Sequence, residues 1–183
     1  YIPQNLYQWL GAQAGAGDQA ASGACAMAEQ ELAAGISFMN SRGLLHLDAH
    51  FGNILTDGQR LYFTDYGLAM SSGFELSRDE VGFFARHQTY DRCYTAAYLV
   101  HWLVTALHGA EDRDDRDALV RACAAGKYPA GLPEYVAAIL TRHAPVAAVM
   151  SGFIREFAHQ SRESPCPLEE IRQLDGMYSS SAC

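Results

Sequence analysis

Three polar residues, Asp48, Asn53 and Asp65, have the types and the spacing to activate a hydroxyl group and to bind a metal ion. Asn53 lies five residues after Asp48, and Asp65 lies twelve residues after Asn53. A carboxylate can orient and deprotonate an acceptor hydroxyl, and carboxylate and amide oxygens are the hard ligands that Mg²⁺ prefers. Phosphoryl transfer to a hydroxyl requires both functions, so this set of residues predicts that chemistry.

The residues between Asn53 and Asp65 have the pattern of a short β-hairpin. Residues 54–56 predict one strand and residues 61–64 the next, and an Asp-Gly pair just after the first strand supplies the turn. A hairpin folds the chain back on itself, so Asn53 and Asp65 are expected side by side at its open end. Asp48, in the loop just before the hairpin, can point into the same space.

The pattern His46-x-Asp48-x-x-x-x-Asn53, followed by Asp65-Tyr-Gly67, resembles the catalytic-loop and metal-loop pair of the protein-kinase superfamily. The local form, His-x-Asp-x-His-x-Gly-Asn, is more similar to small-molecule kinases of the aminoglycoside/choline phosphotransferase type than to ordinary protein kinases. It also resembles the ABC1-type atypical kinases. The resemblance is specific over residues 44–68 and loose elsewhere, and it implies a mainly α chain with a small β-hairpin, the kinase-like C-terminal lobe.

The resemblance implies a catalytic or binding role at four positions. Asp48 matches the catalytic base, and Asn53 matches the asparagine that holds Mg²⁺ and steadies the catalytic loop. Asp65 matches the main Mg²⁺ ligand on the nucleotide phosphates, and Leu55 matches the apolar floor under adenine. The implied cofactors are ATP and Mg²⁺, and the implied partners are a nucleotide and a hydroxyl-bearing acceptor.

Other positions in the motif match structural residues of the family. His46 matches the histidine that supports the metal loop, and Gly67 matches the glycine that lets this loop turn. Tyr66 replaces the usual phenylalanine. Leu47 replaces the arginine that receives an activation-loop phosphate in many protein kinases, so this form of control is not expected here.

Alternatives remain open for both the site and the function. His46-x-Asp48-x-His50 could be a metal-ligand triplet of a hydrolase, although this interpretation leaves Asn53 and Asp65 unexplained. His50 is otherwise expected to pack in the loop or to lie beside the phosphate. The missing Ala-Pro-Glu motif, Leu47 and the His50-bearing loop favour a small-molecule acceptor; a Ser/Thr-type protein kinase and a non-catalytic pseudokinase or regulatory module are the alternatives.

Composition sets the class of protein. The chain has 183 residues, 49% of them hydrophobic and 19% charged, which predicts one globular domain with a core. The net charge of −8 argues against nucleic-acid and anionic-membrane partners. The five cysteines form no Cys-x-x-Cys pair and predict free thiols in a reducing compartment, so a cytoplasmic location is expected. No apolar run, including residues 95–107, is long enough to predict a membrane span.

The resemblance also divides the chain and implies a missing part. Residues 1–10 resemble the hinge that leaves the ATP cleft, residues 11–174 the C-lobe, and residues 175–183 a flexible tail. The family's N-lobe supplies a glycine-rich phosphate loop and a strand lysine, whereas the only lysine here is Lys127. We therefore expect an N-lobe to act in cis or in trans, and this segment alone to be inactive.

The remaining patterns predict helices and their ends. Residues 11–18 suggest a loop, and a helix follows over about 20–41, with Asp18 as its N-cap, Gly43 as its stop, and Met27, Leu32, Ile36 and Met39 facing inward. Ser77 to Glu80 is a capping box that begins a helix to about residue 87.

Beyond residue 90 the chain is expected to be helical almost throughout. Asp91 is expected to cap a helix over residues 92–108. The charge run 111–117 is expected to be a solvated helix start, with some potential to attract a cationic substrate, and its helix runs to about residue 125. Pro133 and Pro145 are expected in the first turns of two further helices, 133–143 and 145–161, and a last short helix covers 168–174.

Overall fold

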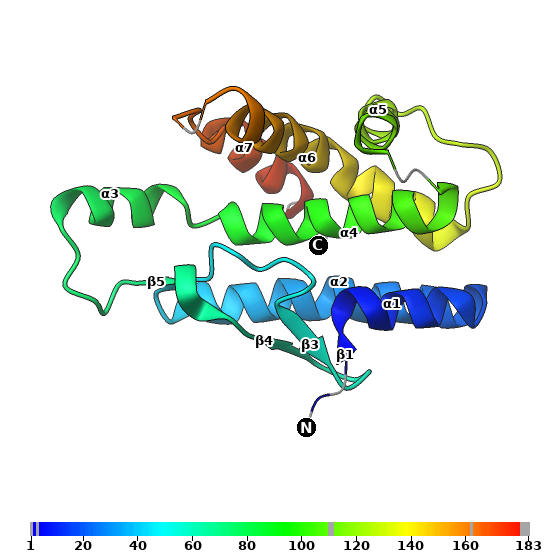
Figure 1. Ribbon diagram of the computed structural model, residues 1–183, viewed down its shortest axis with the longest axis horizontal. Helices are drawn as coiled ribbons and strands as arrows, with labels where there is room; N and C mark the ends of the chain where they lie inside the picture. The colour runs from blue at the N-terminus through cyan, green and yellow to red at the C-terminus, as the bar shows by residue number, and fades with distance from the viewer. Residues whose placement is uncertain (1, 3, 110–111, 162, 180–183) are drawn as a thin grey trace. The chain divides into compact units, whose positions relative to one another are not determined.

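The computed structural model describes residue 2 and residues 4–109, 112–161 and 163–179 (Figure 1). The described chain is mainly helical with a small amount of β-sheet, as the sequence predicts. The chain divides into two compact units, Tyr1–Thr95 and Ala96–Cys183. The boundary between them falls inside helix α4, Tyr90–His108.

The first unit begins with two consecutive helices, α1 (Leu6–Gly15) and α2 (Asp18–Ser41). The side chain of Asn5 caps α1 by accepting a hydrogen bond from the Gln8 N–H at 2.9 Å. The loop predicted over residues 11–18 is confined to residues 16–17, because the alanines in this stretch favour helix enough to carry α1 through Gly11 and Gly15. Asp18 is not an N-cap either, since the chain turns at Gly17, whose φ of 112° places it outside the helix.

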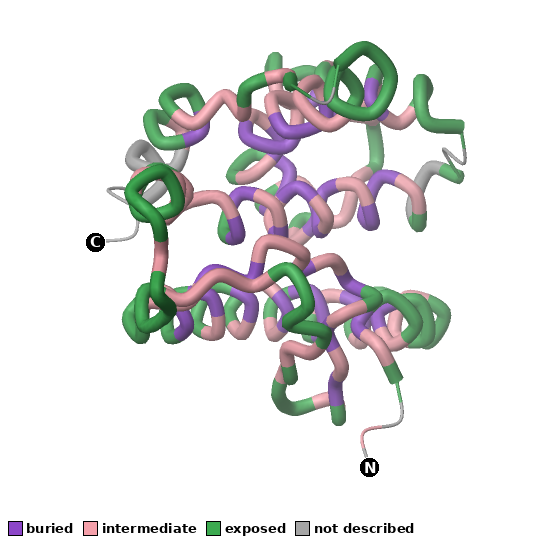
Figure 2. Tube along the Cα trace, turned by 60° about the vertical axis from the view of Figure 1, so that its left-hand side comes forward, coloured by how far each residue is buried: buried purple, intermediate pink, exposed green. Residues whose placement is uncertain are grey.

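Helix α2 buries one face and positions the hairpin. Leu32, Ile36 and Met39 are buried as predicted, whereas Met27 is only half-buried. Figure 2 shows buried and exposed residues alternating along this helix, the pattern of an amphipathic element. The helix ends at Ser41, and Gly43, with φ 69°, turns the chain away as the sequence predicted.

The hairpin is present with the predicted strands. β3 (Ile54–Thr56) and β4 (Leu61–Phe63) are antiparallel, with Ile54 opposite Phe63 and Thr56 opposite Leu61. The second strand is one residue shorter than predicted. β1 (Gln4–Asn5) pairs with the other edge of β3, so the sheet order is β1-β3-β4. β2 (Leu44–Leu45) pairs with β5 (Met70–Ser71), and these two short strands flank the site segment in sequence.

Helix α3 (Arg78–Arg86) begins at the predicted capping box. The Ser77 hydroxyl accepts a hydrogen bond from the Glu80 N–H, and the Glu80 carboxylate accepts hydrogen bonds from the N–H and the hydroxyl of Ser77. Because these contacts satisfy backbone donors at the helix start, a helix forms here soon after Gly67. The segment between Asp65 and α3 is consequently short.

The second unit contains the rest of α4 with α5 (Arg113–Ala124), α6 (Glu134–His159) and α7 (Leu168–Ser179). Helix α5 packs on α6, and α6 packs on α7. The side chain of Asp112 caps α5, and Asp114 and Asp115 are exposed as predicted. Asp117 is an exception to the solvated charge run, because it is buried; Glu111 lies outside the described residues.

Helix α6 corrects one prediction about the prolines. Pro145 does not begin a helix but lies inside α6, which is continuous from Glu134 to His159. The buried stripe of α6 continues across the proline, from Ile139 to Met150, and its packing outweighs the lost backbone hydrogen bond. By length and composition α6 could also cross a membrane. These two properties are weak evidence for a membrane span, because core helices of soluble proteins share them.

Two features of the second unit bear on its stability and its extent. His101 is largely buried, and its Nε2 lies 2.6 Å from the Ser151 hydroxyl of α6, while its Nδ1 is buried with no hydrogen-bond partner. Burial lowers the pKa of the His101 ring below its ordinary value. Helix α7 runs to Ser179, beyond the predicted end at residue 174, and residues 180–183 of the predicted tail lie outside the described residues.

Candidate active site

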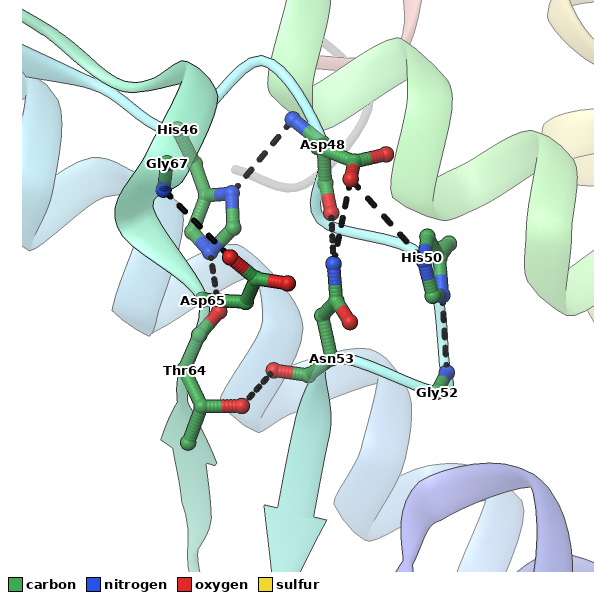
Figure 3. A network of polar contacts seen from close by, with 8 residues as sticks. All are labelled: His46, Asp48, His50, Gly52, Asn53, Thr64, Asp65 and Gly67. Carbon is green, nitrogen blue, oxygen red and sulfur yellow. Dashed lines mark hydrogen bonds and ion pairs between the residues drawn. The ribbon is translucent and has the colours of Figure 1, made fainter.

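Asn53 and Asp65 both lie at the open end of the hairpin, just beyond the paired strands β3 and β4, as the sequence predicted. Thr64, the residue before Asp65, donates two hydrogen bonds to the Asn53 carbonyl, from its N–H at 2.9 Å and from its hydroxyl at 2.8 Å (Figure 3). These bonds continue the β3–β4 ladder by one residue. The hairpin register therefore fixes Asn53 and brings Asp65, the residue after Thr64, to the same end.

Asp48 and Asn53 are in direct contact. The Asn53 amide Nδ2 donates to the Asp48 carbonyl and to the Asp48 carboxylate Oδ2, both at 3.1 Å. Since Nδ2 is turned to Asp48, the amide oxygen of Asn53 is directed elsewhere and stays available as a hard ligand. Figure 3 shows the Asp65 carboxylate on the same side of the hairpin end, with one oxygen directed toward Asn53. An amide oxygen and a carboxylate are a donor set that fits Mg²⁺.

His46 joins the loop before the hairpin to the segment after it. The ring is fully buried, its Nε2 lies 3.0 Å from the Thr64 carbonyl, and its Nδ1 accepts a hydrogen bond from the Asp48 N–H at 3.4 Å. These two contacts together require the tautomer with the proton on Nε2. The ring also lies 4.9 Å from the Tyr66 ring, centre to centre. His46 therefore supports the positions of Asp48 and Asp65, while its predicted role beside a metal loop stays a prediction.

Both nitrogens of His46 are thus occupied by protein groups, which argues against the metal-triplet interpretation. Among the residues that the structure describes, no group of three or more histidine, cysteine, aspartate or glutamate side chains could hold a metal ion. His50 lies beside Asp48, with Nε2 3.9 Å from Oδ2. The contacts of His46 and His50 therefore do not support the histidine metal site.

Two residues of the site have strained backbones. Leu47, with φ 64°, and Asp65, with φ 58°, are the only residues other than glycine with positive φ in the described part of the chain. A left-handed conformation costs a residue with a side chain about 1–2 kcal/mol, and such strain is concentrated at functional sites. At Asp65 the strain turns the chain into the 3₁₀ helix Tyr66–Leu68, and Oδ1 accepts a hydrogen bond from the Gly67 N–H at 3.4 Å.

Asp91 is a site residue that the sequence reasoning missed. Its carboxylate is fully buried and accepts hydrogen bonds from the N–H groups of His46, at 2.7 Å, and Leu47, at 2.8 Å. The predicted capping role is therefore wrong: Asp91 lies in the first turn of α4 and anchors the loop that carries Asp48. Burial raises the pKa of Asp91, and the two backbone N–H groups oppose that rise.

The last predicted residue, Leu55, lies apart from the polar group. It is in the middle of β3, half-buried, and pairs with Asn5 of β1 and Tyr62 of β4. Its side chain is on the opposite face of the strand from those of Ile54 and Thr56, which are buried. The structure thus joins Asp48, Asn53, His46 and Gly67 around the hairpin end and leaves Leu55 on the strand that leads away from it.

No protein-family model matches the chain, and no curated protein sequence matches it either.

Proposed function

We propose that this chain is the C-lobe half of a kinase-like phosphotransferase, which transfers the γ-phosphate of ATP to a hydroxyl group with the help of Mg²⁺. The observation that carries the proposal is the arrangement at the hairpin end. Asn53 holds Asp48, Asn53 and Asp65 lie just beyond the paired ends of β3 and β4, and Leu47 and Asp65 have strained backbones.

Each residue has a separate task in the proposed reaction. The Asp48 carboxylate orients the acceptor hydroxyl and accepts its proton. The Asn53 amide oxygen and the Asp65 carboxylate hold Mg²⁺, which supplies charge neutralisation at the transferring phosphate. His46 and Asp91 do not touch the reacting groups; they hold the loop of Asp48 from two sides. Leu55 is available to the adenine ring only if the base lies along β3.

The acceptor in this proposal is a small molecule. An open, shallow surface pocket of about 470 Å³ lies next to Leu47, the neighbour of Asp48, and a small molecule would fit this volume. Its lining mixes apolar and charged side chains: Leu47, Met70, Asp79, Glu80, Phe83 and Arg86. The short segment between Asp65 and α3 leaves little chain for docking an extended peptide. A protein acceptor remains the alternative, as does a regulatory module without turnover.

The proposal includes a second lobe. Positioning of the nucleotide phosphates supplies much of the rate in phosphoryl transfer, and this needs a cationic clamp opposite the metal. The single lysine, Lys127, follows the end of α5, and the site segment has no glycine-rich loop. We propose that a lobe acting in cis or in trans provides the clamp, so that residues 1–183 alone transfer no phosphate.

The test is phosphate transfer from labelled ATP by the native protein, onto amino alcohols, aminoglycosides and generic protein substrates. Asp48→Ala and Asp65→Asn should each abolish transfer, and Asp65→Asn should also weaken Mg²⁺-dependent nucleotide binding in calorimetry. Asp18→Asn, an exposed carboxylate in the first turn of α2, is the matched control and should leave both unchanged. Unchanged Mg²⁺–nucleotide affinity in Asp65→Asn would remove Asp65 from the metal site, and labelling confined to proteins would overturn the small-molecule acceptor.

A further inference from the structure

The ring of His50 rests directly on the backbone of Gly52. The Gly52 N–H donates to the His50 Nδ1 at 3.1 Å (Figure 3). A Cβ placed on Gly52 would lie 2.8 Å from the His50 Cε1 and 3.0 Å from its Nδ1, closer than side chains normally approach. The φ of Gly52 is not in the left-handed region. The position therefore requires glycine for its missing side chain and not for backbone freedom.

This contact fixes where the proton of the ring lies. A nitrogen that accepts a hydrogen bond carries no proton, so the neutral imidazole must carry it on Nε2. Nε2 lies 3.9 Å from the Asp48 carboxylate Oδ2, the same oxygen that accepts the Asn53 amide at 3.1 Å. The Asn53 amide thus hydrogen-bonds Oδ2 and the His50 Nε2 lies near the same oxygen, whereas none of the described residues hydrogen-bonds Oδ1.

We propose that His50, seated on Gly52, is a positioning residue that fixes the rotation of the Asp48 carboxylate and leaves Oδ1 as the atom that receives the proton. The inference rests on the proposed phosphotransferase function. At 3.9 Å the Nε2–H is outside hydrogen-bond distance, so it acts by attraction to the charge on Oδ2 and by filling the space into which the carboxylate would otherwise turn.

In the proposed phosphoryl transfer, the path of the acceptor proton does not pass through His50. As the acceptor oxygen bonds to the γ-phosphorus, the bond from that phosphorus to the ADP oxygen breaks, and the acceptor O–H proton passes to Oδ1 of Asp48. From there the proton leaves to solvent. His50 cannot take it through Nε2, which already carries a proton, and Nδ1 is occupied by the Gly52 N–H. His50 therefore orients the base and does not relay the proton.

The first arm of the test needs no activity. Long-range ¹H–¹⁵N NMR of the histidine-labelled chain reports the tautomer of each ring, and the signals that disappear in His50→Asn assign His50. We expect the Nε2–H tautomer in the wild type and a changed ring signal in Gly52→Ala. Gly73→Ala is the matched control, because a Cβ there meets only the Ser71 hydroxyl at an ordinary 3.5 Å. A proton on Nδ1 of His50 would contradict the hydrogen bond from the Gly52 N–H to this nitrogen and would overturn the proposal.

The second arm measures transfer by the native protein. His50→Ala should lower kcat about 10- to 100-fold while the KM values for ATP and acceptor change little, because only the alignment of the base is lost. His50→Gln retains an N–H donor near the Nε2 position and should restore most of the rate. His50→Asn keeps only an acceptor for the Gly52 N–H and should not restore it.

A double-mutant cycle separates positioning from general loop damage. Gly52→Ala should lower kcat in the wild type but have no further effect beside His50→Ala, because both changes remove the same contact. An unchanged kcat in His50→Ala, or an equal loss from Gly52→Ala in both backgrounds, would overturn the inference. Absence of transfer in the wild type would instead overturn the proposed function, and the NMR arm would still decide whether the ring is seated as described.

Discussion

Replacement of Asp91 should separate the loop that carries Asp48 from its anchor. In Asp91→Ala, the N–H groups of His46 and Leu47 lose the acceptors that they reach at 2.7 and 2.8 Å. An unsatisfied buried N–H costs about 1–3 kcal/mol, so two of them cost about 2–6 kcal/mol together. Removal of the buried carboxylate offsets part of this loss in stability, because burial of its charge is itself unfavourable. We expect a net loss of about 2–3 kcal/mol in the free energy of unfolding, in line with values for broken buried networks.

Asp91→Asn should cost less than Asp91→Ala, by about 1 kcal/mol, because the amide oxygen still satisfies one of the two N–H groups. Urea unfolding followed by circular dichroism measures the loss, and hydrogen exchange at the amides of His46 and Leu47 locates it. Asp18→Ala is the matched control, since Asp18 and Asp91 both lie in the first turn of a helix and interact similarly with its dipole.

The comparison with Asp18→Ala separates the loss of the loop anchor from the loss of a carboxylate at a helix start. If Asp91→Ala loses no more stability than Asp18→Ala, or if the two amides stay equally protected, the carboxylate does not anchor the loop and the reasoning fails. The raised pKa of Asp91 also predicts the direction in which stability changes with pH. Between its ordinary pKa of 3.8 and its higher folded value, the folded state binds more protons than the unfolded chain, so this group's contribution to stability falls as pH rises through that window. Asp91→Asn should remove this slope.

Three further predictions concern the framework. Gly35→Ala should destabilise the chain by about 1–3 kcal/mol, because a Cβ there would collide with the ring of Phe63. A Cβ at Gly23 in the same helix meets nothing within 4 Å, so Gly23→Ala should stabilise the chain by about 0.5–1 kcal/mol. Equal denaturation midpoints for the two variants would refute the difference. Pro145→Ala should raise the melting temperature, since an interior proline costs a helix about 3 kcal/mol, and a lower value would show that α6 needs its proline. The lowered pKa of His101 means that the unfolded chain binds more protons below about pH 6.5, so stability should fall as pH falls through this region, and a His101→Gln variant that keeps the same pH slope in urea titrations would contradict it.

Local patterns predicted the features that depend on local chemistry. The hairpin follows from two short apolar runs around Asp57-Gly58, and Gly58 has the positive φ of 86° that such a turn requires. The Ser77–Glu80 capping box likewise involves residues three positions apart. Asn53 and Asp65 come to the same end of the hairpin because β3 pairs with β4, so their proximity needs no long-range information.

Features that depend on distant partners were not predictable in the same way. Asp91 lies 45 and 44 positions from the two N–H groups that it binds, and in sequence it is indistinguishable from a helix cap. The continuity of α6 through Pro145 depends on apolar packing that overrides a local helix breaker. The left-handed backbone of Leu47 could not be read from the sequence, since leucine normally avoids it and the hydrogen bond that anchors Leu47 is accepted by the distant Asp91.

The pairing of β1 with β3 links the order of the site to residues far earlier in the chain. Two-stranded hairpins are marginally stable in water, and Gln4 and Asn5 add the third strand by pairing with Thr56 and Leu55. If these two residues detach, β3 should open locally and faster amide exchange should spread from Leu55 toward Asn53. A fusion tag or a cleavage site placed next to residues 4–5 is therefore expected to change the local stability of the hairpin end that carries Asn53.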